Sequence, residues 1–158
     1  MEDFFIEKYK KYHDDVYRLA YSYTLNMQDS EDILQRTFIK FYKNIDKFVK
    51  GEDEYIKRWL FKVSVNEAKD VLKSFWRVHK VDNNDFENLK YAEDNPKDYD
   101  LLQALNNIDK KYRITFYLYY YEGYEIKEIA NIMHLSESAI KSRLSRMRDK
   151  LKIELEEK

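Results

Sequence analysis

At 158 residues, 44% of them hydrophobic, the chain can build one ordinary domain or two small ones, and its formal net charge is only −1. It contains two glycines and one proline, which disfavours sheets joined by tight turns and predicts an all-α fold. The absence of cysteine excludes disulfides, thiolate metal sites and a thiol nucleophile.

The near-neutral charge conceals a partition along the chain. Residues 1–80 hold 16 Lys or Arg against 14 Asp or Glu, residues 81–100 hold 2 against 7, and residues 101–158 hold 11 against 9. The acidic middle piece contains Pro96, the only proline, and is typical of a flexible linker. We therefore expect two small helical bundles joined by an acidic linker; the alternative is a long loop within one domain.

The first unit is predicted to be a bundle of three or four helices, the first of which runs from about Phe5 to Leu25. A second helix begins near the motif NMQDSED, where Asp29 or Ser30 is expected to cap it. Its apolar residues step by four, three, four and three positions, the pattern of a helix buried on one side: Leu34, Phe38, Phe41, Ile45 and Phe48.

A third helix, rich in Lys and Arg, is predicted from about Tyr55 to Arg77, after a break at Gly51. The second unit then opens with an apolar helix at roughly 101–121 and a break at Gly123. YEIKEIANIM forms a short helix, HLS interrupts it, and ESAIKSRLSRMRDKLKIELEE forms the last helix, with Ser136 as its expected N-cap. This order of helix, tight turn and helix is the helix-turn-helix arrangement.

The last helix is expected to bind DNA. The stretch 140–152 carries six Lys or Arg and one acidic residue in a chain that is close to neutral. On a helical wheel Ser138, Ser142 and Ser145 lie opposite the apolar side, and cations flank them on both sides. Short side chains let the backbone approach a groove while the cations reach the phosphates on either wall. The alternative is a solvated helix whose cations pair with nearby glutamates.

No pattern of catalytic, metal-binding or cofactor-binding residues is found. His13, His79 and His134 are scattered without ligand spacing, and neither glycine lies in a phosphate-binding loop of the Walker or dinucleotide type. The longest apolar run, at 114–121, is far short of the roughly 18 residues that a membrane span needs. We expect a soluble, cytoplasmic protein that is not an enzyme, with no cofactor, metal, small-molecule substrate or direct membrane insertion.

The motifs of both units resemble those of bacterial extracytoplasmic-function (ECF) sigma factors. GYEIKEIANIMHLSESAIKSRLSRMRDKL is similar to their carboxy-terminal DNA-reading module, called region 4. DSEDILQRTFIKFY and RWLFKVSVNEAKDVLKSFWR resemble two segments of their region 2, in the same order, so that the resemblance covers about 13–77 and 101–155. It implies a region 2-like unit at 1–80, a linker at 81–100 and a region 4-like unit at 101–158. The implied partners are core RNA polymerase, promoter DNA and an anti-sigma factor.

The resemblance also implies where each partner binds. Core polymerase is expected at four residues of the second helix: Asp29, Glu31, Asp32 and Gln35. The minus-ten promoter element is expected on the third helix, with the Gly51 loop capturing an unstacked base: Lys57, Arg58, Trp59, Lys62, Asn66, Asp70 and Arg77. The minus-thirty-five element is expected on the last helix: Ser136, Glu137, Ser138, Lys141, Ser142, Arg143, Ser145 and Arg146.

Several of these residues also allow a purely structural interpretation. Asn66 and Asp70, four positions apart on a helix, can bond to each other or to Arg77. Asp29 and Glu31 can simply cap their helix. Two other functional classes stay open: a conventional helix-turn-helix regulator that acts without polymerase core replacement, and a helical interaction protein whose cations keep it soluble.

Three positions bear on how the resemblance is interpreted. Trp59 can belong to the core rather than stack on a base. Leu60 stands where primary sigma factors have the second residue of a strand-opening aromatic pair, which implies weaker melting. His134 replaces the usual glycine of the turn, where a left-handed backbone is expected, and this predicts some strain or a reshaped turn.

Overall fold

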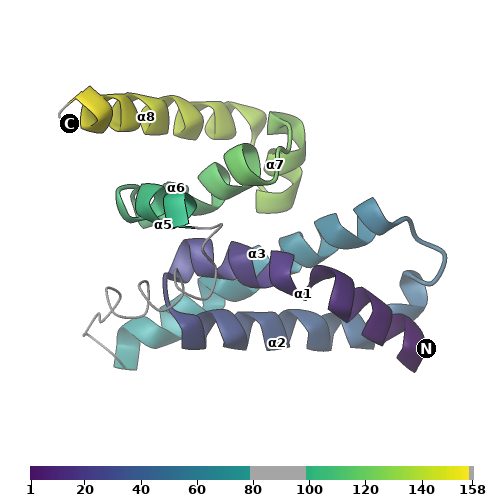
Figure 1. The fold of residues 1–158 in the computed structure, drawn as a ribbon. Helices are drawn as coiled ribbons and strands as arrows, with labels where there is room; N and C mark the ends of the chain where they lie inside the picture. The colour runs from purple at the N-terminus through teal and green to yellow at the C-terminus, as the bar shows by residue number, and fades with distance from the viewer. Residues whose placement is uncertain (79–98, 157–158) are drawn as a thin grey trace. The chain divides into compact units, whose positions relative to one another are not determined.

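A computed structural model of the chain describes residues 1–78 and 99–156, and within them the side chains of 1–71 and 103–150. These residues form helices and no strand, which confirms the predicted all-α fold (Figure 1). The chain divides into two compact units, Met1–Asn84 and Asp85–Lys158. The expected linker at 81–100 lies outside the described residues, apart from its last two positions, which begin a helix.

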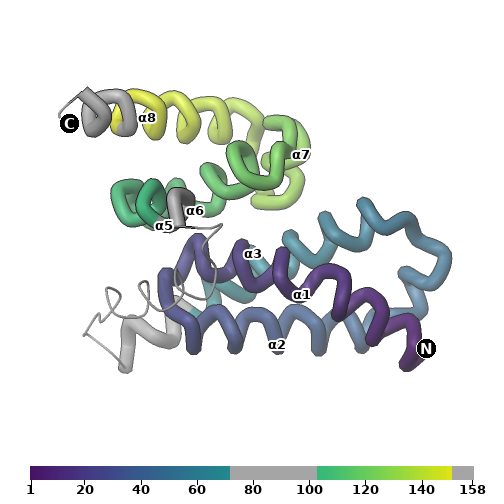
Figure 2. Tube along the Cα trace, viewed as in Figure 1, coloured from purple at the N-terminus to yellow at the C-terminus, as the bar shows by residue number. Residues whose placement is uncertain are grey.

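The first unit consists of three long helices that all contact one another, α1 (Glu2–Thr24), α2 (Met27–Lys43) and α3 (Asp53–Val78). After α2 the chain passes through the short 3-10 helix η1 (Ile45–Lys47) and a loop, and α3 then returns in the opposite direction (Figure 2). The predicted apolar stripe of α2 and η1 is confirmed, because its five residues from Leu34 to Phe48 are at most 7% exposed.

The start of α2 differs from the prediction. Asn26, and not Asp29 or Ser30, is the N-cap, because the Asn26 side chain accepts a hydrogen bond from the Asp29 backbone N–H at 2.8 Å. The helix therefore begins one turn earlier, and Ser30 is fully buried, with its hydroxyl 3.0 Å from that of Thr24. Asparagine, aspartate and serine cap almost equally well, so the choice depends on where the chain turns.

The interface between α2 and α3 contains polar pairs within an apolar surrounding. The Thr37 and Ser64 hydroxyls are both buried and lie 3.3 Å apart. The Glu67 side chain is only 6% exposed; its carboxylate pairs with Lys40 and lies 3.9 Å from the Arg36 guanidinium. Because a buried carboxylate needs a cation, these contacts hold α2 against α3.

The second unit contains α5 (Tyr99–Asn106), α6 (Lys110–Phe116), the π-helix η3 (Tyr117–Tyr121), α7 (Ile126–Met133) and α8 (Glu137–Glu156). The single helix predicted at 101–121 was wrong, because the chain leaves the helical path between α5 and α6. There the Arg113 Nε donates to the Ile108 carbonyl at 3.1 Å, and Asn and Asp neighbours compete with helical hydrogen bonds.

The turn between α7 and α8 is confirmed as a helix-turn-helix connection. His134 ends α7 with φ 55° and ψ 43°, the left-handed conformation that glycine usually supplies. Its backbone N–H donates to the Ala130 carbonyl, as does that of Leu135 at 3.0 Å. The expected cap of α8 is also confirmed, since the Ser136 hydroxyl accepts a hydrogen bond from the Ala139 N–H at 3.0 Å.

Candidate nucleic-acid interface

The outer face of α8 is polar, as the helical wheel predicts. Ile140, Leu144 and Met147 are at most 2% exposed and pack inward. On the other side lie exposed residues, all of them predicted as contacts to the minus-thirty-five element: Glu137, Ser138, Lys141, Ser142, Ser145 and Arg146, together with Ser136 at the cap. Arg143 is half-buried on the flank. The short serine side chains leave the α8 backbone open to a groove, with cations beside it.

The arginines of α8 are held by neutral oxygen atoms. Arg143 donates to the Lys111 carbonyl at 2.8 Å, and Arg146 lies 3.4 Å from the Tyr112 hydroxyl. On the opposite flank Arg148 donates to the hydroxyls of Tyr120 at 3.2 Å and Tyr119 at 3.4 Å. Neutral acceptors orient a guanidinium without cancelling its charge, so these arginines remain able to bind phosphate.

These contacts affect ionisation in a consistent direction. The hydrogen bond from Arg146 lowers the pKa of Tyr112, and the same contact raises the pKa of Arg146. The Tyr120 hydroxyl likewise raises the pKa of Arg148. The guanidinium groups therefore keep their full charge at any pH at which the protein is used. Lys150 differs, because it pairs with a carboxylate, that of Asp109, at 3.1 Å.

The tyrosines that contact the arginines of α8 were not predicted from the sequence. They lie 28 to 34 positions before the arginines that they contact, within a run that was assigned to one apolar helix. A signal was available, because three consecutive tyrosines are an unusual choice for a buried stripe. Tyr120 and Tyr121 are in fact 47% and 41% exposed.

Most of the predicted minus-ten residues lie along one side of α3. Arg58, Lys62, Asn66 and Asp70 are separated by steps of four, which places them in a row; the first two are half-buried and the last two are exposed. Among the described residues no hydrogen bond joins Asn66 to Asp70. Lys57 lies apart from this row, with its ammonium 5.6 Å from the centre of the buried Phe61 ring. The Arg77 side chain lies outside the described residues.

Trp59 has both a packed and an accessible part. Its ring centre lies 4.8 Å from that of Phe48 and 6.1 Å from that of Phe41, so one part of the indole belongs to the core. The side chain is nevertheless only half-buried. Trp59 therefore packs on Phe48, at the start of the loop that connects η1 to α3, and keeps part of its ring accessible.

The predicted polymerase-binding residues occupy the start of α2. Glu31, Asp32 and Gln35 are exposed on its outer side, whereas Asp29 is only 8% exposed. Beside Gln35 the surface of α1 and α2 forms a groove of about 340 Å³ lined by Phe5, Gln35, Phe38, Ile39, Tyr42 and Lys43. Ile39 and Tyr42 are 54% and 57% exposed. The groove was not predicted from the sequence, because Ile39 and Tyr42 interrupt the polar side of α2 and do not belong to its buried stripe.

The described residues contain neither a metal-binding cluster nor a membrane-spanning helix. Within that part of the chain no cluster of three or more His, Asp or Glu side chains is placed to hold a metal ion. No helix in the same part has both the length and the apolar character of a membrane span.

The fold and the exposed residues define a two-unit helical protein with a helix-turn-helix in its second unit. The sequence pattern described as sigma-70 region 2 matches residues 9–78, and that described as sigma-70 region 4 matches residues 99–151. The chain belongs to the RNA polymerase sigma factors, within the ECF group. Family membership also confirms that it is an initiation factor and not an enzyme.

Individual proteins show the same relationship. The chain is 33% identical to RNA polymerase sigma factor SigV of Bacillus subtilis over 142 residues, which is 89% of this chain and 84% of SigV. It is 30% identical to ECF sigma factor SigM of the same organism over 152 residues, 92% of this chain and 91% of SigM. The solved structure of sigma factor RpoE with anti-sigma factor NepR from Bartonella quintana has a similar fold, with a TM-score of 0.70 at 22% identity, over 99% of this chain and 98% of RpoE.

Proposed function

We propose that this chain binds core RNA polymerase and directs it to promoters, with one promoter element on each unit. The observation that carries the proposal is the outer face of α8, where serines and Lys141 are exposed between arginines oriented by neutral oxygens. In the proposal this face reads the minus-thirty-five element through Ser136, Glu137, Ser138, Lys141, Ser142, Arg143, Ser145 and Arg146. A conventional regulator acting without the polymerase is not favoured by the family of the chain.

The first unit supplies the other two contacts in this proposal. The outer side of α2, with Glu31, Asp32 and Gln35, binds the polymerase through its acidic and amide groups, which suit a basic partner helix. Its groove adds apolar area, which supplies most of the binding energy at protein interfaces. Asp29 is placed too deeply for more than a supporting role.

The row of four residues along α3 binds and opens the minus-ten element. Arg58 and Lys62 contact the phosphates, and the exposed Asn66 offers the amide that makes paired hydrogen bonds to a base edge. The loop 49–52, next to Trp59, receives the unstacked base. Lys57, Asp70 and Arg77 complete the set carried over from the family, with Lys57 directed away from the row.

The proposed division of the chain is a polymerase and minus-ten unit at 1–80, a linker at 81–100 and a minus-thirty-five unit at 101–158. The protein acts in the cytoplasm, where the polymerase is found. We also propose an anti-sigma partner, by analogy with two proteins of similar fold that were solved as complexes: RpoE with NepR, and CnrH with the cytosolic domain of CnrY, at TM-scores of 0.70 and 0.68.

Run-off transcription with purified core polymerase tests the proposal. Initiation from a promoter fragment should depend on the added chain, and a promoter pull-down with sequencing should identify the two elements. Binding of the chain to one DNA site without polymerase, with no initiation on addition of core enzyme, would instead indicate a conventional regulator.

A further inference from the structure

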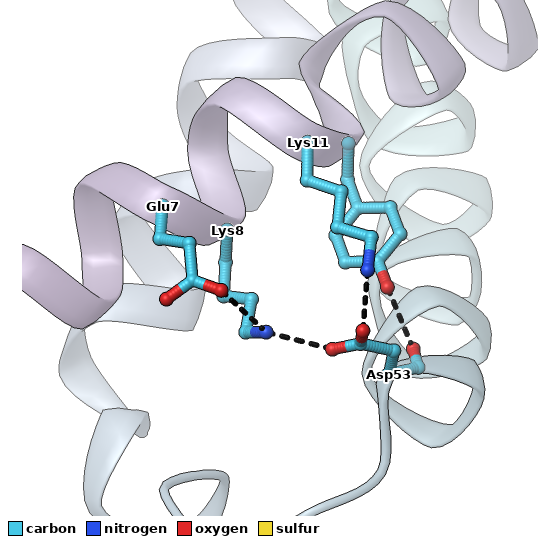
Figure 3. Close-up of polar contacts among 5 residues, drawn as sticks. Glu7, Lys8, Lys11 and Asp53 are labelled. Carbon is cyan, nitrogen blue, oxygen red and sulfur yellow. Dashed lines mark hydrogen bonds and ion pairs between the residues drawn. The ribbon is translucent and has the colours of Figure 1, made fainter.

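An ion-pair cluster ties α1 to the first residue of α3. The Lys8 ammonium donates to one carboxylate oxygen of Asp53 at 2.7 Å, and the Lys11 ammonium donates to the other (Figure 3). The Tyr12 hydroxyl donates to the Asp53 backbone carbonyl at 3.1 Å. These contacts join residues 41 to 45 positions apart, so they determine tertiary structure and not local helix geometry.

The cluster is partly buried, which distinguishes it from an ordinary surface ion pair. The Lys8 side chain is only 8% exposed, and a lysine is rarely so deeply buried without an acidic partner. Its other carboxylate contact, Glu7, is longer at 3.4 Å. Removal of the Asp53 carboxylate would therefore leave a buried cation with only the longer Glu7 contact and the Phe4 ring, whose centre lies 5.3 Å from the ammonium.

Both partners stay charged throughout the usable pH range. The hydrogen bonds from Lys11 and Lys8 lower the pKa of Asp53 to about 2. The hydrogen bond to Asp53 raises the pKa of Lys8. The cluster is therefore a permanent tie and not a pH-dependent switch.

The position of the cluster gives it a mechanical role. The loop between η1 and α3 is held at one end by Phe48, which is 1% exposed and packs on Trp59. The Gly51 N–H donates to the Phe48 carbonyl at 2.9 Å. The other end of the loop is Asp53. Between these two anchors Val49 and Lys50 are exposed to solvent.

We propose that Asp53 is a positioning residue that, through Lys8 and Lys11, holds the loop 49–52 in the shape that receives an unstacked base. The inference rests on the proposed function, in which this loop captures a base of the minus-ten element. A loop anchored at one end only would sample many conformations, and ordering it on DNA would reduce affinity. Because the cluster orders the loop before DNA binds, this loss of affinity is avoided.

The test measures coupling between Asp53 and the captured base. The full chain with core polymerase is bound to promoter fragments carrying single abasic sites across the minus-ten element. With the wild-type chain, one abasic site should weaken binding by roughly tenfold, the size expected for one lost base contact. In Asp53→Asn the same site should cost only about two- to threefold, since the loop no longer makes the full contact.

Three further variants make the result specific. Asp53→Glu keeps a carboxylate and should recover most of the coupling. Lys11→Met keeps the buried pair of Lys8 and Asp53 and should give an intermediate value. Asp46→Asn, which removes an exposed carboxylate from η1, should match the wild type. Circular dichroism of each variant verifies that its helices are intact.

The outcomes separate the inference from the proposed function. If Asp53→Asn lowers affinity for every fragment by one factor and the abasic site still costs tenfold, Asp53 has only a structural role and the inference is wrong. If the wild type forms promoter complexes but no single base matters, the inference and the proposed base capture by the loop 49–52 fail, while promoter recognition by the chain stands. If no polymerase-dependent promoter complex forms, both fail.

Discussion

At the scale of single residues, His134 and Leu25 are informative because both have a left-handed backbone, with φ of 55° and 51°. His134 is exposed, whereas Leu25 is 2% exposed and belongs to the core. A non-glycine residue in this conformation is strained by the contact of its Cβ with the backbone. The same substitution should therefore have opposite effects at the two positions.

We expect His134→Gly to raise the free energy of unfolding of the second unit by roughly 0.5–1 kcal/mol, because glycine relieves the strain and little side-chain contact is lost. Urea unfolding followed by circular dichroism measures the change. Leu25→Gly is the matched comparison and should destabilise the first unit by about 2–5 kcal/mol, since it empties a core position. A loss of stability in His134→Gly would mean that the imidazole makes a stabilising contact.

The Asp53 cluster should make stability depend on pH in acid only. The pKa of Asp53 is lowered to about 2, below its value in an unfolded chain, so its contribution is complete above about pH 4 and disappears as the pH falls through about 2. Asp53→Asn should be less stable than wild type by about 1 kcal/mol at neutral pH, a modest value because Asp53 is half-exposed. Unfolding curves at several pH values should show the difference in free energy of unfolding between wild type and Asp53→Asn shrinking as the pH falls towards 2. A difference that stays constant with pH would contradict the assignment of the lowered pKa to Asp53.

At the scale of elements, substitutions in the groove of α1 and α2 should weaken polymerase binding, and substitutions on the face of α8 should weaken promoter binding, each without the other effect. Ile39→Ser and Tyr42→Ser remove exposed apolar groups, so they should leave stability nearly unchanged and weaken polymerase binding by roughly tenfold each. Fluorescence anisotropy with labelled chain and core polymerase measures the affinity. Val49→Ser, at a residue 48% exposed outside the groove, is the control. Equal losses of polymerase affinity in Ile39→Ser, Tyr42→Ser and Val49→Ser would show that the groove has no specific role in polymerase binding.

Arg143→Ala and Arg146→Ala should have the complementary effect on α8. Promoter affinity should fall while polymerase binding is spared, and the slope of log affinity against log salt concentration should decrease by about one for each lost phosphate contact. Lys10→Ala, on the exposed side of α1, is the charge-matched control. Loss of polymerase binding in the arginine variants would show that the division of labour between the units is wrong.

Sequence patterns predicted the helices where burial is periodic and missed what depends on contacts across the fold. The stripe from Leu34 to Phe48 and the turn at His134 follow from local rules of spacing and backbone conformation. The break between α5 and α6 has a local signal in Asn106, Asn107 and Asp109 that was overlooked, whereas the contact of Arg113 with the Ile108 carbonyl forms only once the chain has turned. The pairing of Tyr112 with Arg146, and of Lys8 with Asp53, likewise requires knowledge of which helices lie together.

At the scale of the whole molecule, the two proposed DNA contacts should reinforce each other because one chain carries both. Linking two binding sites raises the effective concentration of the second and increases affinity by about 10²-fold or more. Fragments 1–80 and 101–158, mixed with core polymerase, should therefore support far less run-off transcription than the intact chain. Circular dichroism of each fragment provides the folding control. Equal activity of mixture and chain would mean that the second unit contributes independently.

The ion pair between the buried Glu67 and the exposed Lys40 has a consequence for how the first unit moves. If α2 moved away from α3, the Glu67 carboxylate would lose both Lys40 and Arg36 inside an apolar interface. We therefore expect α2 and α3 to move together as one rigid body. In the proposed function, a displacement of the outer side of α2 on polymerase binding would then be carried to the proposed minus-ten residues of α3.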